Sequence, residues 1–271
     1  MNSFRNALFR LLSKTWIYRL YTHLLRANLE YKILRYTQFC ASTVKLHAET
    51  FTPFRNIHQG QEIVIFACGP SVKDYQEIAG AIKIGINRSI QIPSLDLDYF
   101  FLVDGGKAFT REEMHRFNTY RGALCKKFYG NQNDETGNGE LFISLQDGYE
   151  ANAYRFNVDN FAIRGRRYTF ASDLTSQPLT APGSSVFAAI QFALWTNPKR
   201  IYLVGCDCTQ AGHFYSTAKN TDLMTDVIID GYVKLKKFAK SRYPETEIVS
   251  VNPVGLKGLF RDWYQKDGPL G

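Results

Sequence analysis

The sequence predicts an α/β protein: a single Rossmann-like domain with a mainly parallel sheet, preceded by a basic helical extension. Short apolar runs that end in small or polar residues recur from residue 61 onward, as buried parallel strands do. The run at 186–195 is apolar on most sides, which indicates a buried helix between strands. With 271 residues, the chain can bury one large core. We expect residues 1–60 to form the extension and a connector, and residues 61–271 to form the domain.

The positive charge lies mostly at the N-terminus. The formal net charge is +8, yet residues 1–36 contain seven Lys or Arg residues against one acid, Glu30, and so carry +6. The basic balance is therefore no sign of a nucleic-acid surface on the domain, and we expect no nucleic-acid partner. The five cysteines are irregularly spaced, which is typical of reduced thiols in a cytoplasmic protein.

Residues 3–37 are predicted to be helical. Apolar residues recur there at steps of three and four, namely Phe4, Leu8, Leu11, Leu12, Trp16, Leu20, Leu24 and Leu25. Basic residues and tyrosines are interleaved with them, which is typical of a helix lying on an anionic membrane. The alternative is a helix that packs on the domain and keeps a basic solvent face. Residues 38–60 contain Pro53, Asn56 and Gly60 and are expected to be a connector.

The chain is not expected to cross a membrane or to be secreted. No uncharged apolar run approaches the ~18 residues of a spanning helix, and Arg5, Arg10 and Lys14 interrupt any signal-peptide core. We therefore expect a cytoplasmic protein that contacts the inner face of the cytoplasmic membrane peripherally.

The first strand of the domain is expected at residues 63–67, and it ends in the turn Gly69-Pro70-Ser71. Ser71 is expected to open a helix near residues 72–79. A strand, a glycine turn and a helix N-terminus form an anion site, because free N–H groups and the helix dipole favour negative charge. The turn therefore predicts a nucleotide phosphate site, and a turn that binds nothing is the alternative.

The next two strands are expected at residues 81–86 and 99–103, where they end at Asn87 and Asp104. Ligands of open parallel sheets bind at such carboxyl ends. We therefore expect both side chains to lie near the phosphate turn.

The stretch at about 129–180 is expected to be a mobile loop and lid. Residues 129–139 are polar and glycine-rich, which indicates a loop. Residues 150–180 are expected to form a lid or an acceptor-binding subdomain. Their basic residues would bind an anionic acceptor or the donor carboxylate, or belong to a solvated loop; they are Arg155, Arg164, Arg166 and Arg167.

A second strand and turn unit follows. Gly183-Ser184-Ser185 precedes the expected buried helix at 186–195, and a strand at 200–205 ends in Cys206-Asp207-Cys208. A helix at about 222–241 and a strand at 247–251 are expected to complete the domain.

Four motifs in this order resemble the bacterial sialyltransferases of glycosyltransferase family 42. They are Gly69-Pro70-Ser71, Asn87, Gly183-Ser184-Ser185 with the helix that follows, and the strand at 200–205 with Asp207. They also resemble the related motility-accessory glycosyltransferases and archaeal pterin diphosphokinases. The resemblance covers about residues 61–255. It implies an inverting, metal-independent glycosyltransferase that transfers a CMP-activated sialic acid or related ulosonic acid to a cell-surface glycan such as lipopolysaccharide or capsule.

The resemblance also implies which residues meet the donor nucleotide. These residues are Cys68, Gly69, Pro70, Ser71, Asn87, Asp104, Gly183, Ser184 and Ser185. Two positions depart from the family, because asparagine often stands there where this chain has Cys68, and the third strand ends in asparagine instead of Asp104. Read as residues alone, Ser184 and Ser185 could be helix caps, and Asp104 could cap a loop.

Catalysis is assigned to His213, Tyr215 and Asp207. The family uses a histidine as the base for the acceptor hydroxyl and tyrosines to stabilise the departing phosphate. Of five histidines, only His213 lies just past an expected strand end, and imidazole titrates near the working pH. The family histidine lies farther along, in a stretch that here reads Ala218-Lys219-Asn220-Thr221-Asp222 and has no adjacent histidine.

No metal and no cofactor other than the donor are expected, because CMP leaves as a monophosphate that hydroxyl and N–H groups can hold. Asp96-Leu97-Asp98 has the D-x-D spacing of metal-dependent glycosyltransferases, but it precedes a strand, which favours a turn. Cys206, Asp207 and Cys208 could be metal ligands. The alternative is small buried cysteines, with Asp207 hydrogen-bonded to loop N–H groups or to the nucleotide ribose.

Two other functions stay open on the sequence. One is a Mg-ATP-dependent diphosphokinase of the pterin type, which would need more acidic residues at strand ends than Asp104 and Asp207. The other is a non-catalytic relative that binds glycan or membrane, which the cysteine at position 68 and the displaced histidine would suit.

Overall fold

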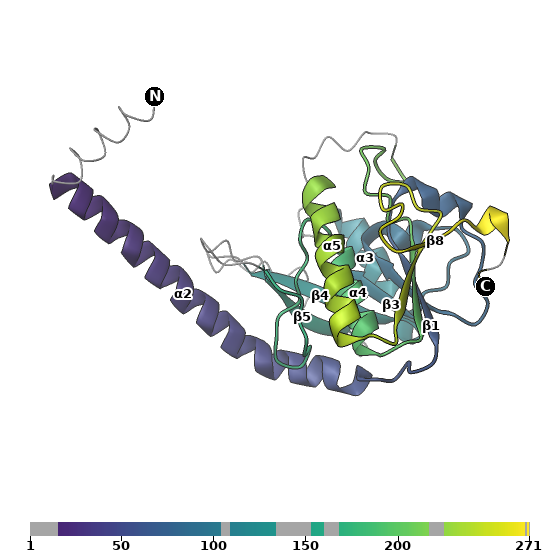
Figure 1. Cartoon of the computed structure of the whole chain (residues 1–271). Helices are drawn as coiled ribbons and strands as arrows, with labels where there is room; N and C mark the ends of the chain where they lie inside the picture. Colours follow the sequence, from purple (N-terminus) through teal and green to yellow (C-terminus); the bar gives the residue numbers. More distant parts are fainter. Residues whose placement is uncertain are drawn as a thin grey trace, which may run out of the picture.

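The computed structural model describes residues 16–103, 109–133, 153–159, 168–216, 225–268 and 270. Its described strands form one eight-stranded sheet in the order β5-β4-β3-β2-β1-β6-β7-β8, and every neighbouring pair is parallel (Figure 1). The predicted class, an α/β domain with a mainly parallel sheet and an N-terminal helix, is confirmed.

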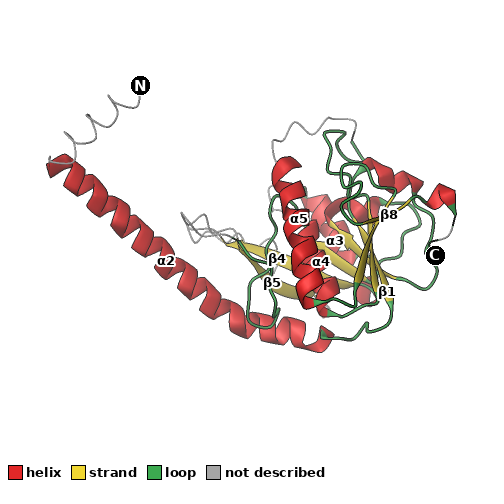
Figure 2. Cartoon of the chain, viewed as in Figure 1, coloured by secondary structure: helices red, strands yellow, loops and turns green. Residues whose placement is uncertain are grey.

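The bounds of the elements are as follows. The strands are β1 Glu62–Phe66, β2 Ile82–Ile86, β3 Tyr99–Leu102, β4 Lys126–Asn133, β5 Ala153–Asp159, β6 Arg200–Val204, β7 Glu247–Val251 and β8 Arg261–Trp263. The helices are α2 Trp16–Phe51, α3 Arg111–Thr119, α4 Val186–Trp195 and α5 Thr225–Arg242 (Figure 2). Short 3₁₀ helices lie at Thr52–Phe54, Pro70–Asp74, Asn87–Gln91, Gly122–Leu124 and Gln265–Asp267.

The strand β1 is buried on both faces of the sheet. Its residues Ile63 and Ile65 join a core with α4, α5 and the end of α2, while Val64 and Phe66 join a second core with α3. Burial on both faces explains why β1 is an unbroken apolar run. The sheet is therefore sandwiched between helices.

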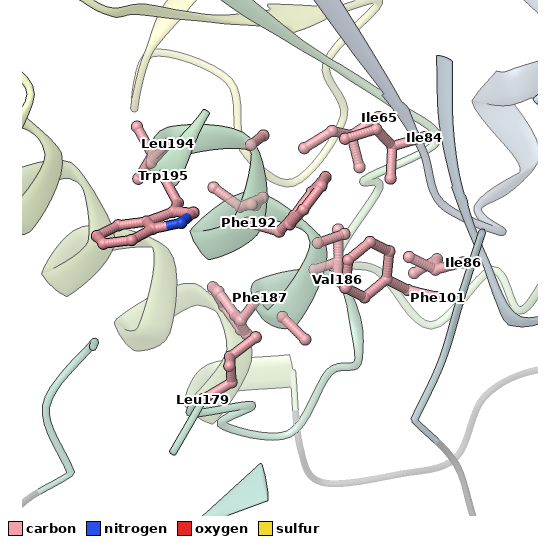
Figure 3. Close-up of a cluster of buried hydrophobic side chains, with 14 of the residues drawn as sticks. Ile65, Ile84, Ile86, Phe101, Leu179, Val186, Phe187, Phe192, Leu194 and Trp195 are labelled. Atoms are coloured by element: carbon pink, nitrogen blue, oxygen red, sulfur yellow. The ribbon is translucent and has the colours of Figure 1, made fainter. Parts of the chain in front are cut away.

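Helix α4 is the most buried helix described. All ten of its residues are buried, and Figure 3 shows Val186 and Phe192 of this helix facing Ile65 and Phe101 of the neighbouring strands. Apolar residues on all sides are expected of a helix in the middle of a core. Its predicted bounds, residues 186–195, are confirmed.

Most of the predicted strands are also confirmed. Those expected at 63–67, 81–86, 99–103, 200–205 and 247–251 are β1, β2, β3, β6 and β7, within a residue at each end. The helix expected at 222–241 is α5, described from Thr225 to Arg242.

The helix expected near residues 72–79 is wrong. A 3₁₀ helix of five residues, Pro70–Asp74, is followed by non-helical chain. Side chains hold this segment in place: the Ile78 N–H donates to the Tyr75 hydroxyl at 3.0 Å, and the Gln76 N–H donates to the Gln265 side chain at 2.7 Å. The Gly69-Pro70-Ser71 turn therefore does not open an α-helix. No α-helix dipole is present there to favour a bound phosphate.

The connector expected at 38–60 is wrong for its first part, because α2 continues to Phe51. The end of α2 binds the edge strand β5 through polar side chains. The Asn157 N–H donates to His47 Nε2 at 2.7 Å, and the Thr50 hydroxyl donates to the Arg155 carbonyl at 2.7 Å. Apolar periodicity did not predict this part of the helix, because the side chains that bond the sheet edge are polar.

The loop and lid expected at about 129–180 are wrong for residues 129–133 and 153–159, whereas the described residues 168–180 form no helix or strand. Residues 129–133 belong to β4 and residues 153–159 form β5, which pairs with it. Of the arginines assigned to the lid, Arg155 lies in β5; the others, Arg164, Arg166 and Arg167, fall outside the described residues.

Within the described ranges, no helix has both the length and the apolar character that crossing a bilayer requires.

Candidate functional site

A cavity of about 360 Å³ lies at the carboxyl ends of β1, β2 and β6. The chain leaves β1 toward β2 on one side, and β6 occupies the other side, so the sheet order reverses at β1. Ligands of open parallel sheets bind at such a switch point, because the connections diverge there and leave a crevice.

Nine of the twelve predicted site residues line this cavity. They are Cys68, Gly69, Asn87, Gly183, Ser184, Ser185, Asp207, His213 and Tyr215. Pro70 and Ser71 are not in the lining, and Asp104 lies outside the described residues. Four stretches that are far apart in the sequence thus meet at one site.

Gly69 is needed because the ends of β1 and β6 approach closely. Its N–H donates to the Gly205 carbonyl at 2.8 Å. A Cβ at position 69 would lie 2.5 Å from the Gly205 oxygen and 2.6 Å from the Asp207 Cγ. The reason for glycine here is therefore packing, since its φ of −68° suits any residue.

Asp207 holds the Gly69-Pro70-Ser71 turn in place. Its buried carboxylate accepts the Ser71 N–H at 2.9 Å on one oxygen and the Ser71 hydroxyl on the other. The predicted bond from Asp207 to a loop N–H group is confirmed. Ser71 does not line the cavity. Its hydrogen bonds go to the Asp207 carboxylate instead.

Asn87 ties three elements together. It has a φ of 48°, a left-handed conformation that asparagine tolerates better than most residues. Its Nδ2 donates to the Ser185 hydroxyl at 3.2 Å, and its Oδ1 accepts the Val103 N–H at 3.4 Å. The end of β2 is thereby linked to the end of β3 and to the start of α4.

Ser185 does not cap α4 with its side chain. It occupies the N-cap position in a helical conformation and makes no side-chain capping bond. The capping alternative is wrong for Ser185, whose hydroxyl meets Asn87 at the cavity instead. Ser184 also lines the cavity, directly before the helix N-terminus.

Two cysteines at the site have thiols with a raised pKa. Burial raises the pKa of Cys208 to about 12 and that of Cys206 further. The Cys68 thiol is buried and donates to the Ile86 carbonyl at 3.6 Å. Among the described residues, no group of three His, Cys, Asp or Glu side chains is placed to hold a metal. Cys206 and Cys208 are only partly buried, whereas the sequence predicted small buried residues.

His213 and Tyr215 lie together at the exposed mouth of the cavity. Their rings stack at 5.1 Å between centroids, with 16° between the planes. The Phe214 N–H donates to the Cys68 carbonyl at 2.9 Å, which anchors this loop to the end of β1. The predicted catalytic pair is thus beside the predicted nucleotide residues.

Arg88 lines the cavity and was missed by sequence reasoning. It donates to both carboxylate oxygens of Glu113, at 2.7 and 3.3 Å, and these bonds lower the pKa of Glu113 and raise the pKa of Arg88. Its guanidinium lies 5.3 Å from the Tyr215 ring centroid and 4.7 Å from that of Phe109. An arginine directly after Asn87 at a strand end was the available signal.

The D-x-D motif lies in the loop before β3, at the opposite end of the sheet. The Asp98 carboxylate accepts the Lys83 N–H at 2.8 Å, and Asp96 pairs with Arg121 at 3.4 Å. Both aspartates precede β3, whereas the cavity lies past the strand ends. The turn residues are Pro93 and Ser94, shortly before the motif, and the motif itself is irregular chain.

No protein-family model and no curated protein matches the chain. Among solved structures, the crystal structure of the sialyltransferase CST-II in complex with a trisaccharide acceptor and CMP is similar to it. The TM-score is 0.47 and the sequence identity 12%, over 78% of this chain and 89% of that chain. A likeness at this level says nothing about the ligand or the activity of this chain.

Proposed function

We propose that the chain is a glycosyltransferase that transfers a CMP-activated sialic acid or related ulosonic acid to a cell-surface glycan. The observation that carries the proposal is the cavity at the switch point of the sheet. It brings together Gly69, Asn87, the turn at Ser184 and Ser185, and His213. The choice of a CMP-activated donor rests on the motif resemblance to family 42.

The cavity suits a phosphate monoester with a nucleoside. In the part of its wall that precedes α4, Ser184 and Ser185 offer hydroxyls next to the positive end of a ten-residue helix. Arg88 adds a guanidinium to the cavity wall, and this group forms an ion pair with the Glu113 carboxylate. Hydroxyl, N–H and guanidinium groups can hold a phosphate without a metal.

The reaction assigned to this site is a single displacement. His213 accepts the proton of the acceptor hydroxyl as that oxygen attacks the anomeric carbon of the donor sugar. The bond from the anomeric carbon to the phosphate oxygen breaks, and CMP leaves with the electron pair. The Tyr215 hydroxyl donates a hydrogen bond to the departing phosphate.

Asp207 is given a positioning role in this scheme. Both of its oxygens bind Ser71, so its carboxylate holds the turn that carries Gly69. It is therefore not available as a base, which leaves His213 for that task.

The test is release of CMP from CMP-sialic acid, with and without an oligosaccharide acceptor. His213→Ala is expected to lower acceptor-dependent CMP release by about 100-fold or more, because general base catalysis contributes 10²–10⁴-fold. His115→Ala is the matched control, since His115 is an exposed histidine of α3 and does not line the cavity. Equal activity of wild type and His213→Ala would contradict the mechanism.

The diphosphokinase alternative has less support from the described residues. Mg²⁺ is held by carboxylates and phosphates. Within the described part of the cavity wall, Asp207 is the one carboxylate, and it is engaged with Ser71. A non-catalytic relative that binds glycan or membrane would release no CMP from the donor, so the same assay separates it from an enzyme.

Contact of residues 3–37 with an anionic membrane, and with it a peripheral location and a lipid-linked acceptor, stays a prediction. Support comes from the basic side chains of α2; that of Arg26, for example, is 80% exposed. Flotation with vesicles of anionic and of zwitterionic lipid tests it, and binding to the anionic vesicles alone is expected.

A further inference from the structure

Half of helix α2 projects from the domain and exposes apolar side chains. Figure 1 shows its N-terminal part extending away from the sheet, while its C-terminal part packs beside β5. The exposed apolar side chains in this part are Leu20, Leu24, Leu25, Leu29, Tyr31, Ile33 and Leu34, and each is at least 40% exposed. So many exposed leucines on one element call for a partner.

These residues form two rows on opposite sides of the helix. At about 100° per residue, Leu25, Leu29 and Ile33 lie on the same side as Thr43 and His47, the side that packs on the domain. This row continues the docked face outward. The second row lies about 180° away and has no counterpart in the docked part.

The second row has the spacing of a coiled coil. It consists of Leu20, Leu24, Ala27, Tyr31 and Leu34, at alternating steps of four and three. That is the a and d pattern of a heptad, with Leu24 and Tyr31 at a and with Leu20, Ala27 and Leu34 at d. A membrane surface takes one broad apolar face, whereas a second helix takes a narrow seam like this one.

The charges beside the seam are complementary for a parallel pair. Glu30 precedes Tyr31 and so occupies position g, and Arg35 follows Leu34 and occupies position e. In a parallel dimer, the residue at position g of one helix faces the residue at position e of the next heptad of the partner helix. Glu30 of each copy therefore pairs with Arg35 of the other copy, which gives two symmetric ion pairs. Glu30 also pairs with Arg26 of its own helix at 2.9 Å, which uses one carboxylate oxygen.

We propose that the row Leu20, Leu24, Ala27, Tyr31 and Leu34 binds the same row of a second copy of this chain, as a parallel two-stranded coiled coil. The seam covers only two heptads, so the dimer is weak, with a dissociation constant on the order of 10 μM. This contact is independent of the function proposed for the cavity.

Sedimentation velocity of the full chain across a concentration series tests the proposal. Wild type is expected to pass from monomer to dimer, and Leu24→Asp to stay monomeric. Leu29→Asp is the matched control, since it places the same charge on the opposite row and should leave the dimer intact. Unchanged melting temperatures would show that both variants fold.

A charge swap tests the parallel register. Glu30→Arg and Arg35→Glu each place like charges at both symmetric pairs and are expected to weaken the dimer about tenfold. An equimolar mixture of the two variants restores both pairs and should dimerise as wild type does. A mixture that stays monomeric contradicts the parallel register.

Two further outcomes would overturn the proposal. One is a wild-type chain that is monomeric at every concentration, while Leu24→Asp abolishes flotation with anionic vesicles; the row would then face lipid. The other is equal loss of the dimer in Leu24→Asp and Leu29→Asp, which would place the contact elsewhere.

Discussion

Gly69 shows how one residue type can be required by close packing alone. Its absent side chain lets the turn after β1 rest against Gly205 and Asp207, and that contact shapes the cavity wall. The sequence marked Gly69 as a site residue from its motif. The packing partner could not be predicted, because it comes from a strand more than a hundred residues away.

Gly69→Ala is therefore expected to lower both stability and CMP binding. Overpacking of this kind costs about 1–3 kcal/mol, which equilibrium unfolding in urea measures. Gly80→Ala serves as the control, since a Cβ there meets nothing within 4 Å and the strain comes only from its φ of +74°. That variant should lose about 1 kcal/mol and keep CMP binding. Intact binding in Gly69→Ala would contradict the packing account.

His47 is a neutral histidine inside the contact between α2 and β5. Its Nδ1–H donates to the Leu174 carbonyl at 3.0 Å, and its Nε2 accepts the Asn157 N–H, so the two bonds define one tautomer. Burial lowers the pKa of His47 from 6.5 to about 4. The folded state therefore resists protonation that the unfolded state accepts.

The sign of the pH dependence follows from this lowered pKa. Stability from a neutral His47 is present above pH 6.5 and is lost as the pH falls from 6.5 toward 4. We expect the free energy of unfolding to drop by about 2 kcal/mol between pH 7.5 and 5.0, measured in urea. His47→Gln should have a flatter profile, and an equal drop in that variant would assign the effect to other groups.

At the scale of elements, polar residues explain why the sequence patterns did not predict β4, β5 and the last turns of α2. The strands β1, β2, β3, β6 and β7 are apolar and were predicted. The strands β4 and β5 carry polar residues; a loop was expected at the end of β4, and a lid or acceptor-binding subdomain was expected at β5. The last turns of α2 meet β5 with threonine and histidine, which no apolar stripe reveals.

The end of α2 and the 3₁₀ helix Thr52–Phe54 after it belong to the core, and a pair of truncations tests this. Phe51 is 0% and Phe54 3% exposed, and both rings pack on Phe128. Loss of one such ring costs about 3–5 kcal/mol, so a chain lacking residues 1–60 is expected not to fold. A chain lacking residues 1–33 should melt within a few degrees of wild type. Equal melting of both truncations would contradict this contact.

At the scale of the whole molecule, the sheet order explains why the predicted residues meet. Three of the four motifs followed a predicted strand, so their common edge could be foreseen, whereas Gly183-Ser184-Ser185 preceded a predicted helix. The sequence did not show that β1 lies between β2 and β6, and this placement makes the end of β1 the switch point. The pairing of Arg88 with Glu113 could not be foreseen, because α3 was not predicted.

The central claim is that the cavity at the switch point binds CMP without a metal. The most direct measurement is the melting temperature of the full chain with CMP, CDP, UDP and ATP, each with and without Mg²⁺. We expect CMP at about 100 times its dissociation constant to raise the melting temperature by roughly 5 °C, equally in EDTA and in Mg²⁺. Stabilisation by Mg-ATP alone, or by none of these nucleotides, would contradict the claim.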